Sequence, residues 1–219
     1  MTLTELVQRA YQLATSKAIA PTAGNTKYDK IVGFANICTD QWQNESGVDW
    51  NSQYMKVTLP TTVTATDTIP LTASIRKVAN SDSDFITITC PGGSIVKFTI
   101  VRPEELDPTE NTVARVGSNL VFARTFKTTD PEYGGSVKVP CYKYASTLSN
   151  GSDEVEVDIP LWLAYMTAAE YCRTDMQLNF LEDGLVARAS ELMTEMKANN
   201  SGQFDTVRRA PLGMVSRSW

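Results

Sequence analysis

The sequence contains no histidine among its 219 residues. Histidine is the commonest general base and the commonest metal-binding side chain in proteins. Without it, no cysteine or serine has the usual base to activate it. The sequence also lacks a P-loop and a GxSxG motif. We therefore expect no enzyme, no catalytic residues, no metal site and no bound cofactor.

Long apolar runs and an excess of positive charge are also missing. No run approaches the roughly 18 residues that cross a bilayer, and the first residues show no secretory signal pattern. We expect no membrane anchor. The 20 basic and 25 acidic residues give a formal charge of -5. This balance argues against a dedicated nucleic-acid binder, although it is compatible with a protein that surrounds DNA without holding it.

The four cysteines, Cys38, Cys90, Cys141 and Cys172, are far apart and form no CxxC pair. Such spacing is not typical of a disulfide framework or a zinc site. We expect reduced thiols in a protein made in the cytoplasm.

Carboxylates form two clusters in the sequence. Glu104, Glu105 and Asp107 lie in a proline-bounded segment, and a second group precedes the C-terminal helices: Asp153, Glu154, Glu156 and Asp158. In an extended segment, the last three would share one side. Paired carboxylates can hydrolyse glycosides or bind calcium. Neither cluster has EF-hand spacing, and solvated surface is the preferred interpretation.

Helical periodicity occurs at both ends of the chain. Residues 2–16 and 26–43 repeat apolar side chains at helical spacing, and Thr2 and Glu5 have the spacing of a capping box. Residues 158–199 repeat the pattern twice, with a break at 175–177. We predict a helical hairpin there, capped by Asp158 and with Pro160 in its first turn.

The central segment instead favours strands. Residues 54–101 are rich in Thr, Val and Ile, and Pro60 is expected at a sheet edge or bend. The clearest hairpin pairs 85–90 with 94–100 across Pro91-Gly92-Gly93. Further strands are predicted at 71–76, at 113–116 with 120–124, and at 136–142, with one helical turn possible in 102–112.

The predicted fold is α+β. The N-terminal helical pair (1–49) packs with the C-terminal hairpin (158–199) as a four-helix body, into which a central antiparallel β block (50–157) is inserted. An extended C-terminal arm (200–219) follows. Neighbouring termini are common in domains, which favours this arrangement.

The arm combines little periodicity with several large apolar and basic side chains. Trp and Arg are enriched at the centres of protein interfaces, whereas disordered segments are depleted in large apolar residues. We therefore predict that the arm binds a partner. The candidate partner-binding residues are Phe204, Val207, Arg208, Arg209, Pro211, Leu212, Met214, Val215, Arg217 and Trp219.

Aromatic residues leave an alternative open. Trp42, Trp50 and Tyr54 lie near the helix-to-strand junction, and Tyr142 and Tyr144 alternate late in the β block. If exposed, they could stack on sugars, which would indicate a module for carbohydrate or receptor recognition. Buried aromatics would be ordinary core packing.

The order of these features resembles the head-to-tail connector (adaptor, or neck) proteins of tailed bacteriophages. The resemblance covers about half of the chain. Its features are the N-terminal helix TELVQRAYQLA, the β-rich centre, the acidic lead into Ile159-Pro160, the Leu-Ala-Tyr and Ala-Ala-Glu-Tyr run, the break near Asp175, the long amphipathic helix and the C-terminal arm. The large β block departs from the smallest members, which are almost wholly helical.

This resemblance implies a structural virion protein without catalytic activity. Such proteins form a homo-oligomeric ring, commonly of 12 copies, in the neck between head and tail. The C-terminal arm docks onto the portal protein, tail or nozzle proteins bind the opposite side, and DNA passes through without sequence-specific binding during ejection. An acidic body would repel DNA from the channel wall.

Overall fold

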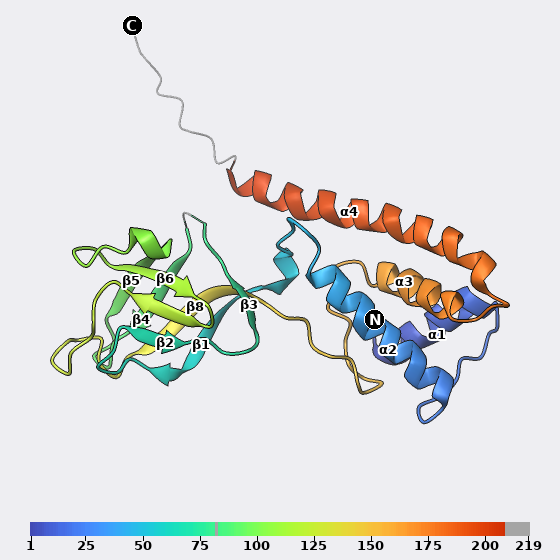
Figure 1. The fold of residues 1–219 in the computed structure, drawn as a ribbon, viewed down its shortest axis with the longest axis horizontal. Coiled ribbons are helices and arrows are strands. Elements are labelled where there is room, and N and C mark those ends of the chain that lie inside the picture. The colour runs from blue at the N-terminus through green and yellow to red at the C-terminus, as the bar shows by residue number, and fades with distance from the viewer. Residues whose placement is uncertain (82, 209–219) are drawn as a thin grey trace, which may run out of the picture. The chain divides into compact units, whose positions relative to one another are not determined.

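The computed structural model describes residues 1–81 and 83–208, with side chains described up to Ser201. Within these residues the chain divides into two compact units. One unit joins residues 1–52 to the residues from 145 onward, and the other consists of residues 53–144. The fold is α+β, as predicted, with the N- and C-terminal helices packed together and a central mixed sheet (Figure 1).

The helical unit is organised around its third helix. Helices α1, α2 and α4 each pack on α3, which lies between α4 and the α1/α2 pair (Figure 1). Its helices are α1 (Leu3–Thr15), α2 (Thr26–Gln43), α3 (Pro160–Arg173) and α4 (Glu182–Arg208), with short 3-10 turns η1 (Asn51–Gln53) and η3 (Asn179–Leu181). Small side chains permit this packing, because Ala164, Ala168 and Ala169 of α3 are all buried.

The helix starts follow from local chemistry. Thr2 accepts a hydrogen bond from the Glu5 amide, and Glu5 accepts one from the Thr2 amide, so the predicted capping box is confirmed. Asn25 caps α2 by accepting from the Lys27 amide at 2.9 Å. The predicted cap at Asp158 is wrong. Helix α3 begins at Pro160, so its N-cap is the preceding residue, Ile159, which provides no side-chain hydrogen bond. Asp158 lies one residue before the N-cap position.

The end of the hairpin also differs from the prediction. Helix α4 continues to Arg208, so residues 200–208 are helical and do not belong to an extended arm. None of the helices described is long and apolar enough to cross a membrane.

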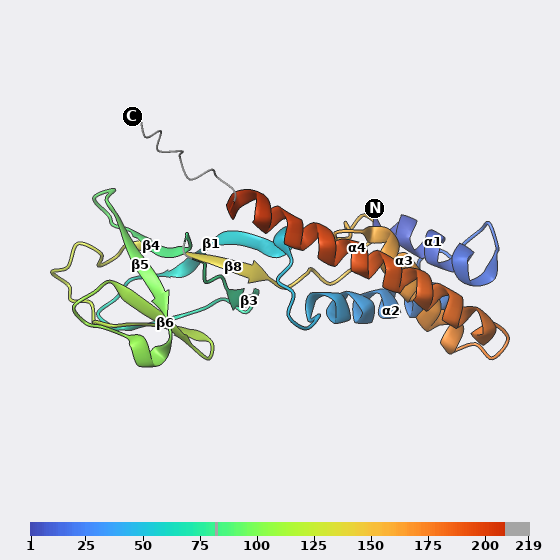
Figure 2. The same ribbon diagram turned by 90° about the horizontal axis from the view of Figure 1, so that it is seen from above.

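The β unit is a nearly closed mixed sheet. In the described residues its strands run in the order β1-β8-β4-β5-β6-β7-β2, and β3 also pairs with β8. Figure 2 shows β1, β8, β4, β5 and β6 of this order. The strands are β1 (Tyr54–Thr62), β2 (Thr68–Pro70), β3 (Ile75–Val78), β4 (Phe85–Thr89), β5 (Ile95–Val101), β6 (Thr112–Val116), β7 (Asn119–Phe122) and β8 (Ser136–Lys143). Pro60 lies in β1, at one end of this order, where a missing amide hydrogen is tolerated.

Two hairpins are confirmed and two predictions are corrected. β4 pairs with β5, where Gly93 takes a positive φ of 84° in the connecting turn, and β6 pairs with β7. However, β5 and β6 pair in parallel, so the sheet is mixed and not antiparallel throughout. The strand predicted at 71–76 is confirmed only at its end, because residues 71–74 form a turn closed by the bond from the Ile75 amide to the Thr72 carbonyl, and β3 begins at Ile75.

The segment from 145 to 157 belongs to the helical unit and not to the β block in which it was predicted. Its backbone is hydrogen-bonded to helix side chains. The Ala145 amide donates to Gln43 Oε1 and the Leu148 amide donates to Asn36 Oδ1, both at 2.8 Å. Leu148 and Val157 are buried in the helical core. Side chains of α2 therefore hold this segment, which connects β8 to α3.

Candidate partner-binding surface around the end of helix α4

The last described side chains of α4 are attached to the segment that follows α2. Asn200 Oδ1 accepts from the Asn51 amide at 2.9 Å, and the Asn200 carbonyl accepts from Asn51 Nδ2 at 3.1 Å. Asn200 Nδ2 also donates to the Asp49 carbonyl at 3.0 Å. Three hydrogen bonds thus hold the half-buried Asn200 of α4 against the segment that follows α2.

An ion pair and a buried methionine support the same attachment one turn earlier. Lys197 Nζ lies 2.6 Å from Glu45 Oε1 at the surface, where such a pair contributes at most about 1 kcal/mol. Met196 is 1% exposed and packs in the helical core. The apolar contact is the larger contribution, since burying a methionine side chain is worth roughly 1.5–3 kcal/mol.

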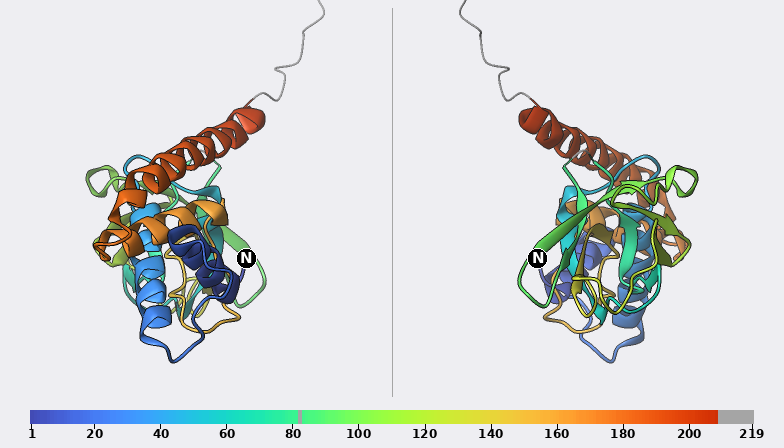
Figure 3. Two further views of the ribbon diagram at one scale, coloured as in Figure 1. Left: turned by 90° about the vertical axis from the view of Figure 1, so that its right-hand side faces the viewer. Right: turned by 90° about the vertical axis from the view of Figure 1, so that its left-hand side faces the viewer.

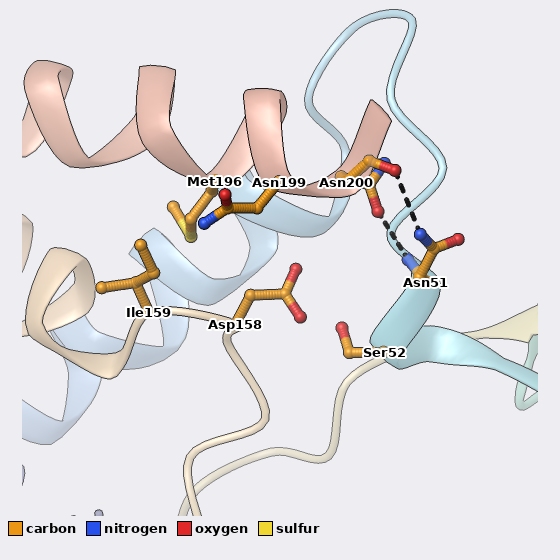
Figure 4. A pocket seen from close by; sticks show the side chains of 7 residues that line it. All are labelled: Asn51, Ser52, Asp158, Ile159, Met196, Asn199 and Asn200. Atoms are coloured by element: carbon orange, nitrogen blue, oxygen red, sulfur yellow. Dashed lines mark hydrogen bonds between the residues drawn. The ribbon is translucent and has the colours of Figure 1, made fainter. Parts of the chain in front are cut away.

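A polar cleft of about 420 Å³ opens beside this attachment. Figure 4 shows Asn51, Ser52, Asp158 and Asn200 around the cleft, with Met196 and Ile159 along another side. Its walls come from α4, from the start of η1 and from the residues before α3. The cleft offers amide, hydroxyl and carboxylate groups for hydrogen bonds.

The predicted partner-binding residues fall on both sides of the limit of the described structure. Helix α4 includes the backbone of three candidates that follow Asn200: Phe204, Val207 and Arg208. The remaining candidates lie outside the described residues: Arg209, Pro211, Leu212, Met214, Val215, Arg217 and Trp219. The sequence prediction missed Asn51 and Asn200. The sequence has two consecutive asparagines at 199–200, within a segment of helical periodicity. Because asparagine is disfavoured inside helices, this pair could have indicated a side chain held by tertiary hydrogen bonds.

The carboxylates before α3 form a surface, not a clustered site. Glu154, Glu156 and Asp158 are exposed and alternate with the inward-facing Val155 and Val157, although only one isolated backbone bridge, Thr2 with Glu154, forms there.

The fourth carboxylate of this group stabilises a turn. Asp153 accepts hydrogen bonds from the Ser149 and Asn150 amides at 2.7 Å, which lower the pKa of its carboxyl group. In the described residues, no three Cys, Asp or Glu side chains are placed to hold a metal ion.

The cysteines are not poised for chemistry. All four are buried and free. Burial, followed by the charge of the nearby Glu170 carboxylate, raises the pKa of the Cys38 thiol to about 12. Burial also raises the pKa values of Cys141 and Cys172. These three thiols are therefore protonated at neutral pH and are poor nucleophiles.

The aromatic residues are mostly internal. Trp42 and Trp50 are both 0% exposed and stack at 5.2 Å between ring centroids, and Trp50 Nε1 donates to the Trp42 carbonyl. Tyr142 is also buried, whereas Tyr54 and Tyr144 are partly exposed. The Tyr54 hydroxyl donates to Asp84 Oδ1 at 2.6 Å. The two tryptophans cannot stack on a sugar in this structure.

Charge is divided unequally between the two units. Residues 53–144 contain ten basic and nine acidic side chains. The helical unit up to Asn199 contains seven basic and fifteen acidic ones, a net charge of -8, and residues 200–219 carry +2. The acidity expected of the whole protein is thus a property of its helical unit, and a basic segment follows the attachment at Asn200.

No protein-family model matches this sequence, and a search of curated proteins also finds no match.

Proposed function

We propose that this protein is a structural component of a tailed-phage virion. In this proposal, copies form a ring in the neck, joining the portal vertex of the head to the tail and leaving a passage for DNA. The observation that carries the proposal is the attachment of α4 by Asn200, followed at once by a basic and apolar segment. A helix that is held at Asn200 and followed by apolar and basic side chains is suited to docking on a partner.

The finer architecture belongs to the same proposal. The four helices act as the body of the ring subunit, the β block is an insertion, and the residues from 209 onward form the arm that docks on the portal. Tail or nozzle proteins bind the opposite side. The ring is expected to hold 12 copies, and the protein has no catalytic activity. It is made in the host cytoplasm and resides in the virion.

The charge of the helical unit supports a passage for DNA. Double-stranded DNA carries one negative charge per 1.7 Å or so of its axis. In this proposal the helical unit, with its net charge of -8 per subunit, lines the passage and repels DNA over about one Debye length, roughly 8 Å at physiological salt. DNA then moves without forming the phosphate contacts that a basic lining would make.

Burial of both tryptophans disfavours the alternative of a carbohydrate- or receptor-binding module on the β-rich segment. Partly exposed Tyr54 and Tyr144 are the remaining aromatics that this alternative could use.

Deletion of residues 204–219 tests the proposed docking. The deletion retains Asn200 and its three hydrogen bonds, so the thermal midpoint and the circular dichroism spectrum should change little. Binding to the purified portal, measured by biolayer interferometry, should be lost. Tyr144→Ala, which removes an exposed aromatic side chain from the β unit, is the matched control and should bind normally. Undiminished binding by the truncated protein would show that the arm does not dock on the portal.

Electron microscopy of the protein mixed with portal tests the ring. Closed rings on one face of the portal are expected. Single copies scattered on the portal, without contacts to one another, would contradict the proposal.

A further inference from the structure

The most exposed large apolar side chains of the described residues gather at one end of the helical unit. Met176 is 91% exposed, Ile19 is 86% exposed and Phe180 is 75% exposed. Ile19 lies in the connection between α1 and α2, and the other two lie between α3 and α4. Exposed apolar groups that cluster in this way mark interaction surfaces more often than single ones do.

Contacts between the last turns of α1 and α3 bring these two connections to the same end. The rings of Tyr11 and Tyr171 meet edge to face at 6.2 Å. Cys172 Sγ lies 4.0 Å from the Ala14 carbonyl. Figures 1 and 2 both show the two connections beyond the same ends of α1 and α3.

The two connections carry opposite charges. The acidic turn, residues 174–183, consists of the connection between α3 and α4 and the first two residues of α4, and it bears the exposed Met176 and Phe180. It contains Asp175, Glu182 and Asp183, of which Glu182 lies 3.8 Å from Arg173. The basic loop, residues 16–28, contains Lys17 and Lys27 and no acidic residue.

A cavity of about 420 Å³ lies beside the basic loop, with Ile19, Ala20, Pro21 and Tyr28 in its mainly apolar lining. This volume falls in the range of pockets that accept small molecules, about 300–1,000 Å³. The acidic turn thus has protruding apolar side chains, and the basic loop has an apolar cavity.

Like charges disfavour the pairing of two acidic turns or of two basic loops. The acidic turn leads into α4, and the basic loop leads into α2, while α3 lies between these helices (Figure 3). If both pairs of patches met between the same two copies, they would form a closed two-fold dimer; if each patch meets a different neighbour, the contact is head-to-tail. When the rotation between copies closes, such contacts generate rings.

We propose that the acidic turn of one copy docks on the basic loop of the next copy. Phe180 and Met176 enter the cavity lined by Ile19, Ala20, Pro21 and Tyr28, and Asp183 lies opposite Lys17. The occupant of the cavity is a second copy of this chain, because the turn supplies both the apolar groups and the opposite charge that the loop requires. This contact rests on the proposed ring, for which it supplies the interface between subunits.

Cysteine cross-linking tests this contact in the full-length protein bound to portal. All four native cysteines are buried, so a variant with Ile19→Cys and Phe180→Cys presents two accessible thiols. A short bismaleimide should yield a ladder of dimers, trimers and larger species, because every copy carries both halves of the contact. The matched control joins Phe180→Cys to Ile37→Cys, since Ile37 is an exposed residue of α2 at 51%. It should give no ladder beyond dimers.

Each result of the cross-linking decides between the two proposals. A ladder specific to the 19/180 pair supports the contact. Rings that are visible by microscopy but yield no ladder, or yield equal ladders for both pairs, overturn this contact and leave the proposed ring standing. An absence of rings on the portal overturns the proposed function and the contact together.

Association measurements provide a second readout. Phe180→Ser should weaken self-association about tenfold or more, because a buried aromatic side chain returns to water. Lys17→Glu and Asp183→Lys should each weaken it by up to about fivefold, and the double variant should recover most of the loss. If the double variant loses as much affinity for self-association as the two single variants combined, the two charges do not face each other.

Discussion

Asn51 and Asn200 each bond through a side chain to the backbone of the other. The Asn51 amide donates to Asn200 Oδ1, and Asn51 Nδ2 donates to the Asn200 carbonyl, at 2.9 and 3.1 Å. The two residues are 149 positions apart in the sequence. This reciprocal pair closes the helical unit after the chain has passed through the whole β unit, and it holds α4 at Asn200.

Asn200→Ala should therefore destabilise the helical unit. The substitution removes the side-chain acceptor for the Asn51 amide and the donor to the Asp49 carbonyl, and both are half-buried groups. We expect a loss of about 1–3 kcal/mol in the free energy of unfolding, measured by urea denaturation. Asn199→Ala, at the exposed neighbour, should change it by no more than about 0.5 kcal/mol. Equal effects of the two substitutions would show that the attachment contributes no stability.

Trp50→Ala tests the assignment of the tryptophan pair to the core. The substitution opens a cavity beside Trp42 and leaves the Trp42 carbonyl without its 2.8 Å donor. We expect a loss of about 3–5 kcal/mol. Tyr144→Ala, at a partly exposed aromatic, should cost far less. If Trp50→Ala abolished binding on a glycan array at unchanged stability, Trp50 would be a ligand-binding residue and the core assignment would be wrong.

The helices could be predicted from the sequence because their signals are local. Thr2 and Glu5 are three residues apart, and apolar spacing alone defines the buried faces of α1 and α2. The hairpin between β4 and β5 could be predicted equally well, since its glycine-containing loop joins two segments in which apolar and polar side chains alternate. In each of these elements, the residues that form the structure are neighbours in the sequence.

Most of the features that the sequence did not predict depend on contacts between residues far apart in the chain. The parallel contact of β5 with β6 depends on how the chain returns after η2 (Pro103–Glu105), which no periodicity records. The segment 71–76 alternates like a strand, but Thr72 and Ser74 form a turn with their side-chain oxygens 3.2 Å apart. The Asn51–Asn200 pair was likewise invisible, because a tertiary hydrogen bond leaves only a weak preference in either local sequence.

Gly135→Ala should destabilise the β unit through a steric clash. A methyl group at this position would lie 2.8 Å from the Glu132 and Thr89 carbonyl oxygens and 2.8 Å from Ile88 Cγ2. Backbone oxygens cannot move aside as a flexible side chain can, so we expect a loss of about 1–3 kcal/mol. Gly92→Ala is the matched control, because nothing lies within 4 Å of its added methyl group. In chemical denaturation, the midpoint of Gly135→Ala should be lower than that of Gly92→Ala. Similar midpoints would refute the close packing at Gly135.

The buried Cys38 thiol should make stability fall as the solution becomes alkaline. Burial, followed by the charge of Glu170, raises the pKa of Cys38 from 9.0 to about 12, while Thr167 and Arg173 lower it by less. Between these values the unfolded chain loses a proton that the native protein keeps. Its contribution to stability is therefore complete below about pH 9 and is lost as the pH rises towards 12, at up to about 1.4 kcal/mol per pH unit.

Cys38→Ala isolates this contribution, because the other titrating groups stay in place. Urea denaturation between about pH 8 and about pH 10.5, under reducing conditions, should give a steeper loss of stability for the unsubstituted protein than for Cys38→Ala. The comparison concerns the slopes, so a change in overall stability from the lost sulfur does not affect it. Parallel slopes would mean that Cys38 ionises in the native protein as readily as in the unfolded chain, and that water reaches the interface of α2 with α3.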